Sequence, residues 1–187
     1  MVANRQDRPM NRKVELAKKR FSMPDFHAEL DRQRRARGLS WTQLAAEINR
    51  PFETTPSIPI SPGTLRDMLK KRSVTSAVVL QVLRWLGRIP ESFLSDPTRS
   101  ASPNERLPEA GLDKILRLDT RAIYEALQLE RRRRSLTWQQ LANELPGFTA
   151  SMLTNLENGP LIGFPRVMTL TQWLDLPVAT FVRSRSR

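Results

Sequence analysis

Cysteine is absent from this chain of 187 residues, and histidine occurs only once, as His27. The lack of cysteine excludes disulfide bonds, thiolate metal sites and a thiol nucleophile, and it fits a reducing compartment. A single histidine also excludes a histidine-based metal site or histidine dyad within one chain. We therefore expect no metal site.

Long apolar runs are missing as well. No stretch approaches the ~20 apolar residues that a transmembrane helix needs, and segment 1–20 is basic without the apolar core of a signal peptide. The sequence also has no nucleophile motif and no glycine-rich loop that would cradle a phosphate. We expect a cytoplasmic protein without a membrane partner, which is not an enzyme and has no catalytic residue and no cofactor.

Positive charge is abundant. Lysine and arginine number 31 against 19 aspartates and glutamates, which gives a formal net charge of +12. An excess of this size favours a polyanionic partner, which is a nucleic acid, an acidic membrane surface or an acidic protein. Charge alone does not choose among the three.

The most informative feature is an internal repeat. Segment 39–48, LSWTQLAAEI, returns at an offset of 97 residues as segment 136–145, LTWQQLANEL. Further along the chain the offset is 88, and there Trp85 matches Trp173. The difference of nine residues indicates an insertion in the first copy, which we place at 49–59 because that stretch holds three prolines.

Each copy is expected to form five short helices. In the second helix of the first copy, the apolar residues Trp41, Leu44, Ala45 and Ile48 follow the i, i+3, i+4, i+7 spacing of a buried helix face. Hydroxyl or carboxylate side chains suited to N-caps stand at matching positions in the two copies, and these are Ser22, Ser40, Ser61, Asp119, Thr137 and Thr149. No segment alternates with the period of a strand, so the predicted class is all-α.

The predicted domain boundaries follow from the repeat. The first domain spans 22–95 and the second spans 119–182, with the proline- and serine-containing stretch 96–118 as an exposed, flexible linker. Residues 1–21 are expected to be a basic arm and residues 183–187 a short basic tail.

The order of these motifs resembles the lambda-repressor-like helix-turn-helix family of phage repressors, Cro proteins and bacterial regulators. The second copy carries the closer match, because segment 147–159, GFTASMLTNLENG, is similar to the family's turn, recognition helix and closing Glu-Asn-Gly. The two copies together cover roughly three quarters of the chain. The resemblance implies two tandem five-helix helix-turn-helix domains.

In this family the third helix enters the major groove of duplex DNA. Carried over to the second copy, the resemblance implies base contacts from Ala150, Ser151 and Asn155, with Thr149 and Asn158 near phosphates. Thr154 and Gln140 complete the set of DNA-binding residues expected in this copy. The family's ion pair between the first helix and the end of the recognition helix would join Arg131 to Glu157.

The first copy departs from the family pattern. Pro62, Gly63 and Asp67 take the positions that would face bases, where they offer little hydrogen bonding or repel phosphate. Side chains that would instead grip the DNA backbone are expected at six positions, which are Ser61, Thr64, Arg66, Lys70, Lys71 and Arg72. Equally open is a structural or protein-binding role for this copy.

The function implied by the resemblance is sequence-specific binding of duplex DNA in transcriptional regulation, with the protein associated with the nucleoid when bound. The tandem copies would act as an intramolecular pseudo-dimer, or two chains would form a homodimer, and the sequence leaves both open. The alternative is an adaptor or antitoxin-like module of the same fold that binds an acidic protein partner and grips DNA only non-specifically.

Overall fold

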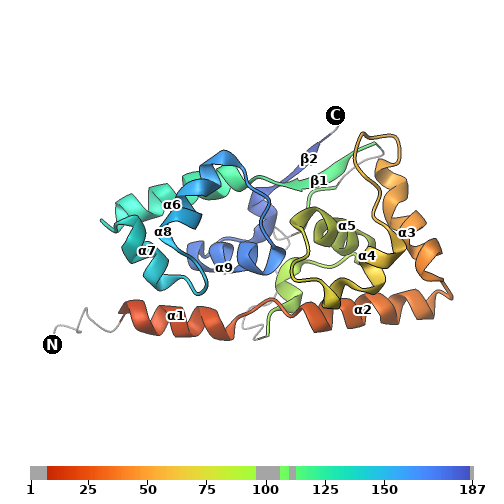
Figure 1. The fold of residues 1–187 in the computed structure, drawn as a ribbon, viewed down its shortest axis with the longest axis horizontal. Coiled ribbons are helices and arrows are strands. Elements are labelled where there is room, and N and C mark those ends of the chain that lie inside the picture. Colours follow the sequence, from red (N-terminus) through yellow and green to blue (C-terminus); the bar gives the residue numbers. More distant parts are fainter. Residues whose placement is uncertain (1–7, 96–105, 110–112, 186–187) are drawn as a thin grey trace.

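The computed structural model describes residues 8–95, 106–109 and 113–185, which form a mostly helical molecule (Figure 1). The helices of the first copy are α2 (Met23–Ala36), α3 (Trp41–Asn49), α4 (Pro62–Arg66), α5 (Ser76–Leu86) and a 3₁₀ turn at Pro90–Phe93. Those of the second copy are α6 (Thr120–Arg133), α7 (Trp138–Glu144), α8 (Ala150–Thr154), α9 (Phe164–Leu174) and a 3₁₀ turn at Val178–Phe181. Helix α1 (Arg8–Lys18) precedes the first copy, while strands β1 (Ile115–Leu118) and β2 (Val182–Arg185) flank the second.

The helix starts agree with the sequence predictions. Ser40 accepts a hydrogen bond from the backbone N–H of Gln43, whose side chain in turn accepts from the backbone N–H of Ser40. Thr137 and Gln140 form the same capping box in the second copy. Such reciprocal caps satisfy two of the backbone donors that the first helical turn leaves without partners. The other expected N-cap side chains also accept backbone hydrogen bonds, and they are Ser22, Ser61, Asp119 and Thr149.

The repeat seen in the sequence extends to individual tertiary contacts. The indole Nε1–H of Trp85 donates to Oε2 of Glu47 at 2.9 Å, and that of Trp173 donates to Oε2 of Glu144 at 2.8 Å. An arginine from the end of the copy's first helix covers each indole, with its guanidinium carbon 4.3 Å from the ring centroid for Arg37 and 4.6 Å for Arg134. The two copies therefore use the same tryptophan–glutamate hydrogen bond to hold their second and fourth helices together, buried in the second copy and partly buried in the first.

The two copies share a core, which corrects the prediction that a flexible linker separates two domains. Phe164 of α9 and Leu116 of β1 are fully buried within the hydrophobic cluster that fills the first copy. The rings of Phe21 and Phe164 meet edge to face with their centroids 5.0 Å apart. Burial of large apolar side chains across the junction supplies the driving force that holds the copies together.

Part of the predicted linker and tail forms a small sheet. Strand β1 pairs antiparallel with β2 so that Ile115 lies opposite Arg185 and Leu118 opposite Val182. The amide nitrogen of Gln81 in α5 also donates to the carbonyl of Leu116 at 2.9 Å. The prediction of no strand was wrong because a four-residue strand is too short to show an alternating pattern. Linker residues 96–105 and 110–112 and tail residues 186–187 lie outside the described residues.

Segment 8–18 of the predicted basic arm is the helix α1, which packs on the second copy against α7 and α9 (Figure 1). Leu16 is buried in the cluster that fills the second copy. The guanidinium Nη2 of Arg12 donates to the carbonyl of Trp173 at 2.6 Å. The prediction of a basic arm is therefore wrong for residues 8–18, because this segment is a helix that packs on the second copy. Residues 1–7 lie outside the described residues.

The insertion 49–59 folds back on the first copy. The side-chain amide of Asn49 donates to the carbonyl of Ile60 and accepts from its backbone N–H, both at 2.9 Å. These two bonds close the base of the loop, and Phe52 inside it is buried. The insertion therefore adds the buried ring of Phe52 to the core of the first copy.

Candidate functional site

The candidate site in the second copy centres on α8 and the 3₁₀ turn Asn155–Asn158 that continues it. Gly147 adopts a φ of 77°, which a residue with a side chain rarely reaches, and this turns the chain sharply between α7 and α8. Thr149 then starts α8 by accepting a hydrogen bond from the backbone N–H of Met152 at 3.2 Å. Leu153 and Leu156 are buried and anchor the segment to the core.

The opposite face of this segment is polar and carries no positive charge. Thr149, Ser151, Thr154, Asn155 and Asn158 are exposed there, and Ala150 beside them is half buried. The side-chain nitrogen of Asn158 donates to Oδ1 of Asn155 at 3.0 Å, which orients both amides. Within the described residues, the side-chain nitrogen of Asn155 makes no hydrogen bond, so it faces solvent as an available donor.

Gln140 also lies where a contact is expected, at the start of α7, and its side chain is exposed. Its Oε1 accepts from the backbone N–H of Thr137 at 2.8 Å as part of the capping box. The bond holds the side chain in place and leaves its Nε2 without a partner in the part of the chain that the structure describes. Gln140 therefore combines a structural contact with an outward-facing donor.

The expected ion pair between Arg131 and Glu157 is not formed. Arg131 donates from Nη1 to the carbonyl of Leu136 at 2.6 Å and from Nη2 to Oε1 of Gln128 at 2.9 Å, and its guanidinium carbon lies 4.8 Å from the ring centroid of Trp138. Glu157 is exposed, and the described residues contain no ion pair to it. The arginine instead closes the turn after its own helix.

The same use of arginine occurs in the first copy, which lacks the glutamate altogether. Arg34 donates from Nη1 to the carbonyl of Leu39 at 2.6 Å, and its guanidinium carbon lies 4.5 Å from the ring centroid of Trp41. A contact found in both copies cannot depend on a glutamate that only one copy has. In each copy the carbonyl of the turn and the tryptophan ring therefore hold the arginine without a glutamate.

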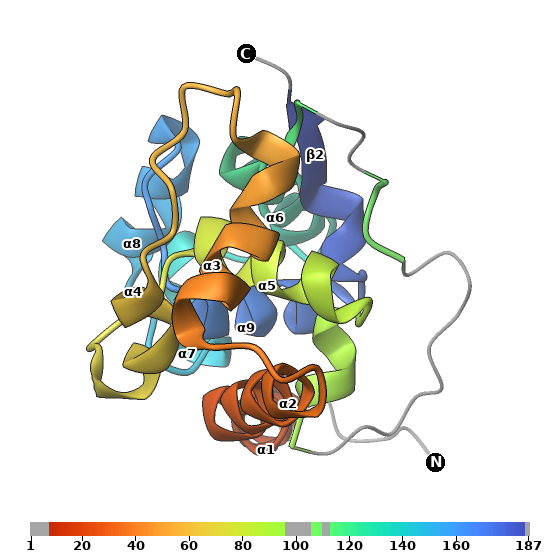
Figure 2. The same cartoon turned by 90° about the vertical axis from the view of Figure 1, so that its right-hand side faces the viewer.

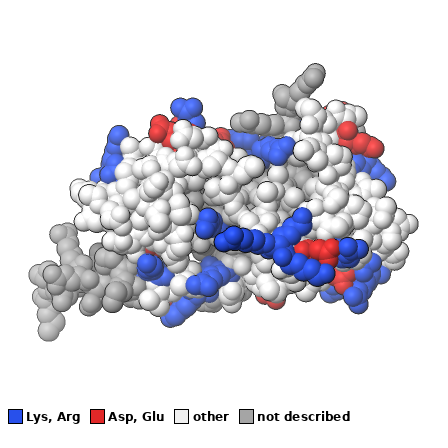
Figure 3. Space-filling model, in the orientation of Figure 1, with Lys and Arg blue, Asp and Glu red and all other residues white. Residues whose placement is uncertain are grey.

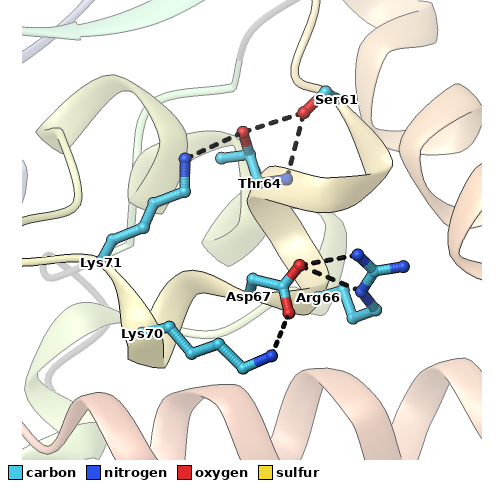
Figure 4. Close-up of polar contacts among 6 residues, drawn as sticks. All are labelled: Ser61, Thr64, Arg66, Asp67, Lys70 and Lys71. Carbon is cyan, nitrogen blue, oxygen red and sulfur yellow. Dashed lines mark hydrogen bonds and ion pairs between the residues drawn. The ribbon is translucent and has the colours of Figure 1, made fainter.

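In the first copy two of the basic residues near α4 pair with one carboxylate (Figure 4). Asp67 accepts from Nη2 of Arg66 at 2.8 Å and from Nζ of Lys70 at 2.9 Å. The hydrogen bonds from Arg66 and then Lys70 lower the pKa of Asp67 to about 2, so this carboxylate stays charged at neutral pH. Two of the cations expected to grip phosphate are therefore already paired.

The other residues of this copy that were expected to contact DNA differ in whether their side chains are already hydrogen-bonded. Ser61 caps α4 by accepting from the backbone N–H of Thr64 at 3.1 Å, and the two hydroxyls lie 3.0 Å apart (Figure 4). Nζ of Lys71 donates weakly to Oγ1 of Thr64 at 3.4 Å. Arg72 is exposed, and no hydrogen bond or ion pair engages its side chain among the described residues. Among the four cations expected to grip phosphate in this copy, Lys71 and Arg72 are thus the two that no carboxylate of the described residues pairs with.

The sequence did not point to Arg166, which lies at the junction of the two copies. A hollow of about 680 Å³ opens there, and its lining includes Lys71, Arg72 and Arg166. Arg166 is exposed and belongs to α9. Its place at the junction depends on how the copies pack, and the repeat gives no matching cation in the first copy, where Val78 stands at the equivalent position.

The two helices that carry the candidate residues lie on one side of the molecule. Helices α4 and α8 face the viewer in Figure 1 and lie together on the left in Figure 2. Figure 3 shows lysine and arginine side chains in a band across the middle of this face, with few charged side chains over α8. The face therefore combines an uncharged polar segment with a central basic band.

No protein-family model matches the chain, and no curated protein or solved structure matches it either. The site must therefore be interpreted from its own chemistry. In the described ranges, no group of three or more histidine, aspartate or glutamate side chains is placed to hold a metal ion. Likewise, no described helix has the length and apolar character needed to cross a bilayer.

Proposed function

We propose that this protein binds duplex DNA sequence-specifically and acts as a transcriptional regulator of the bacterial or phage repressor type. In this proposal each copy is a lambda-repressor-like helix-turn-helix domain, and α8 is the recognition helix that enters the major groove. The order of five helices, the sharp turn at Gly147 and the cap at Thr149 support this interpretation of the second copy. A short helix that stands out from a buried base suits insertion into a groove.

The observation that carries the proposal is the set of exposed, uncharged polar side chains on α8 and at Asn155, on a segment anchored by the buried Leu153 and Leu156. Asn155 offers the amide donor and acceptor that pair in a bidentate way with the N6 and N7 atoms of adenine. Ser151 donates or accepts toward any base edge, and Ala150 suits contact with a thymine methyl. Uncharged side chains of this kind discriminate between bases, whereas lysine and arginine mainly follow the phosphates.

Affinity would come from the charge of the whole chain, which is +12, and from the basic band on the same face. Lys71, Arg72 and Arg166 are the cations that line the hollow at the junction of the copies. Cations that neutralise phosphates release condensed counterions, which makes binding tight and strongly dependent on salt. Thr149, Gln140 and Asn158 would add neutral hydrogen bonds to the backbone and fix the register of α8.

Enrichment sequencing tests the proposal. Random duplex DNA bound to the full-length chain at near-physiological salt is expected to yield a defined motif. Because each bidentate contact is worth roughly 1–3 kcal/mol of discrimination, Asn155→Ala should weaken binding to that motif and relax one of its positions. Asn155 is exposed, so the substitution should leave the fold intact.

Asn143→Ala is the matched control. Asn143 is an exposed asparagine in α7 that accepts from Nε2 of Gln139 at 3.2 Å, outside the recognition segment. The control should select the same motif as the unmodified chain. Binding without any motif, falling steeply with salt, would contradict sequence-specific recognition and direct attention to an acidic protein partner.

A further inference from the structure

The two copies meet through equivalent residues. At the repeat offset of 88, Thr75 corresponds to Gly163, and these two residues face each other in an antiparallel bridge. On one side of the bridge the backbone N–H of Phe164 donates to the carbonyl of Val74 at 3.2 Å. On the other side the hydroxyl of Ser76 donates to the carbonyl of Ile162 at 3.1 Å.

These contacts have the pattern of a two-fold symmetric interface. Phe164 is the repeat equivalent of Ser76, and Ile162 is the equivalent of Val74. Swapping the two copies therefore turns the Phe164–Val74 contact into the Ser76–Ile162 contact. Symmetric dimers of identical chains show this reciprocity, in which residue i contacts j and residue j contacts i. Here the reciprocity joins two halves of one chain.

The segment that precedes each copy packs on the other copy. Helix α1 precedes the first copy but packs on the second, where Arg12 binds the carbonyl of Trp173. Strand β1 precedes the second copy but packs on the first, where Gln81 binds the carbonyl of Leu116. Each copy therefore contributes a segment that packs on the other, and these contacts fix the orientation of the copies relative to each other.

This pseudo-two-fold arrangement is what brings α4 and α8 to one face (Figures 1 and 2). The two helices begin at the equivalent N-caps Ser61 and Thr149, which differ by the same offset of 88 residues. Their surfaces nevertheless differ. That of α8 is uncharged and polar, while α4 continues into Lys70, Lys71 and Arg72. The hollow at the junction, whose lining includes Lys71, Arg72 and Arg166, lies between the copies.

We propose that one chain is a complete and asymmetric DNA-reading unit, equivalent to a repressor dimer, and this rests on the DNA-binding function proposed above. Helix α8 reads the bases of one half-site. The first copy holds the other half-site through phosphates, and Lys71, Arg72 and Arg166 bind the backbone between them. The expected partner is thus a DNA duplex in which one half-site has a defined sequence and the other half-site can have any sequence.

The test uses the full-length chain and the duplex obtained by enrichment. One chain is expected to bind each duplex in a titration followed by light scattering. Hydroxyl-radical footprinting should reveal two protected stretches on one face of the DNA, about 10 base pairs apart. Base-pair changes under α8 should weaken binding roughly ten-fold or more each, whereas changes in the other stretch should weaken it less than about three-fold.

Variants separate the two halves. Asn155→Ala should lower the base preference of the first stretch only, and Arg72→Ala should weaken binding to all sequences and reduce the salt slope by about 1. Arg32→Ala is the control of equal charge, because Arg32 lies on α2 and is already paired with Glu29 at 2.7 Å. It should leave the footprint and the salt slope unchanged.

Two chains on each duplex, a single protected stretch or equal base preference in both stretches would overturn the single-chain unit while leaving DNA recognition intact. A chain that binds no duplex at all would overturn the proposed function and this inference together.

Discussion

At the scale of single residues, Asp67 controls how much positive charge the first copy presents. Its carboxylate pairs with both Arg66 and Lys70, at distances that allow charge-assisted hydrogen bonds. The carboxylate also stands on the face that would approach phosphate. It therefore occupies two cations and would add a charge that repels phosphate. If the chain binds DNA as proposed, we expect the first copy to hold it less tightly than the number of its lysines and arginines implies.

Asp67→Asn should therefore tighten binding to DNA of any sequence, because it frees Arg66 and Lys70 to pair with phosphates. The slope of log affinity against log salt should become steeper by about 1 to 2, as expected for one or two additional phosphate contacts. Affinity measured at several salt concentrations tests this. The pKa of Asp67 is about 2, so the gain should be equal at pH 5 and pH 7.5. Weaker binding at every salt concentration would contradict this role.

Residues that act on their immediate neighbours were predictable from the sequence, and residues that act across space were not. The cap at Thr149 depends on the next three residues, and the turn at Gly147 depends on its own φ, so both follow from local sequence. Arg131 has several acceptors within reach, and the carbonyl of Leu136 and the indole of Trp138 compete better than the exposed Glu157. The availability of Lys71 and the pairing of Lys70 are likewise decided by side-chain positions.

At the scale of elements, the bond between tryptophan and glutamate fastens the second helix of each copy to the fourth. In the second copy the bond is buried, because Trp173 is fully buried and Glu144 is nearly so. In the first copy the Glu47 side chain is 34% exposed, so water replaces a lost partner more readily there. An unsatisfied polar group costs more in the interior than at the surface.

Glu144→Ala should lower the free energy of unfolding by about 1–3 kcal/mol, because it leaves the indole N–H of Trp173 buried without an acceptor. Glu47→Ala is the matched variant and should cost less, about 1 kcal/mol. Glu144→Gln should recover part of the loss, since its amide oxygen still accepts from the indole. Denaturant unfolding of the three variants provides the comparison. Equal losses for Glu47→Ala and Glu144→Ala would mean that burial does not set the cost of losing the acceptor.

Two elements that the sequence did not predict, α1 and β1, are ones whose position depends on tertiary packing. Helix α1 is rich in charge, and it is the buried Leu16 and the contact of Arg12 with Trp173 that place it on the second copy. Strand β1 owes its burial to α5 of the other copy. Apolar periodicity inside each segment is too short to reveal either partner.

At the scale of the whole molecule, we expect the shared core to make the two copies unfold as one cooperative unit. Phe164 belongs to the second copy in sequence, yet its ring lies in the core of the first against Phe21. Loss of this ring would open a cavity where both copies meet. The fixed relation between α4 and α8 depends on the same contact.

Phe164→Ala should lower the free energy of unfolding by about 3–5 kcal/mol, the range found for removal of a buried aromatic ring. Differential scanning calorimetry should show one transition, moved down as a whole by roughly 6–20 °C. Tyr124, half buried on α6 and stacked on Trp138 at a centroid distance of 5.6 Å, provides a control aromatic away from the junction. Division of the transition into a shifted and an unshifted part would mean that the copies unfold independently.

The proposed function requires that this molecule discriminates between DNA sequences through α8. The most direct measurement is the ratio of dissociation constants for the enriched duplex and for a duplex of the same composition in shuffled order, at near-physiological salt. We predict a ratio of at least about 10³ in favour of the enriched duplex, as is typical of specific DNA-binding proteins, and a clearly smaller ratio for Asn155→Ala. A ratio near one for the unmodified chain would contradict the claim, because the protein would then bind only the phosphate backbone.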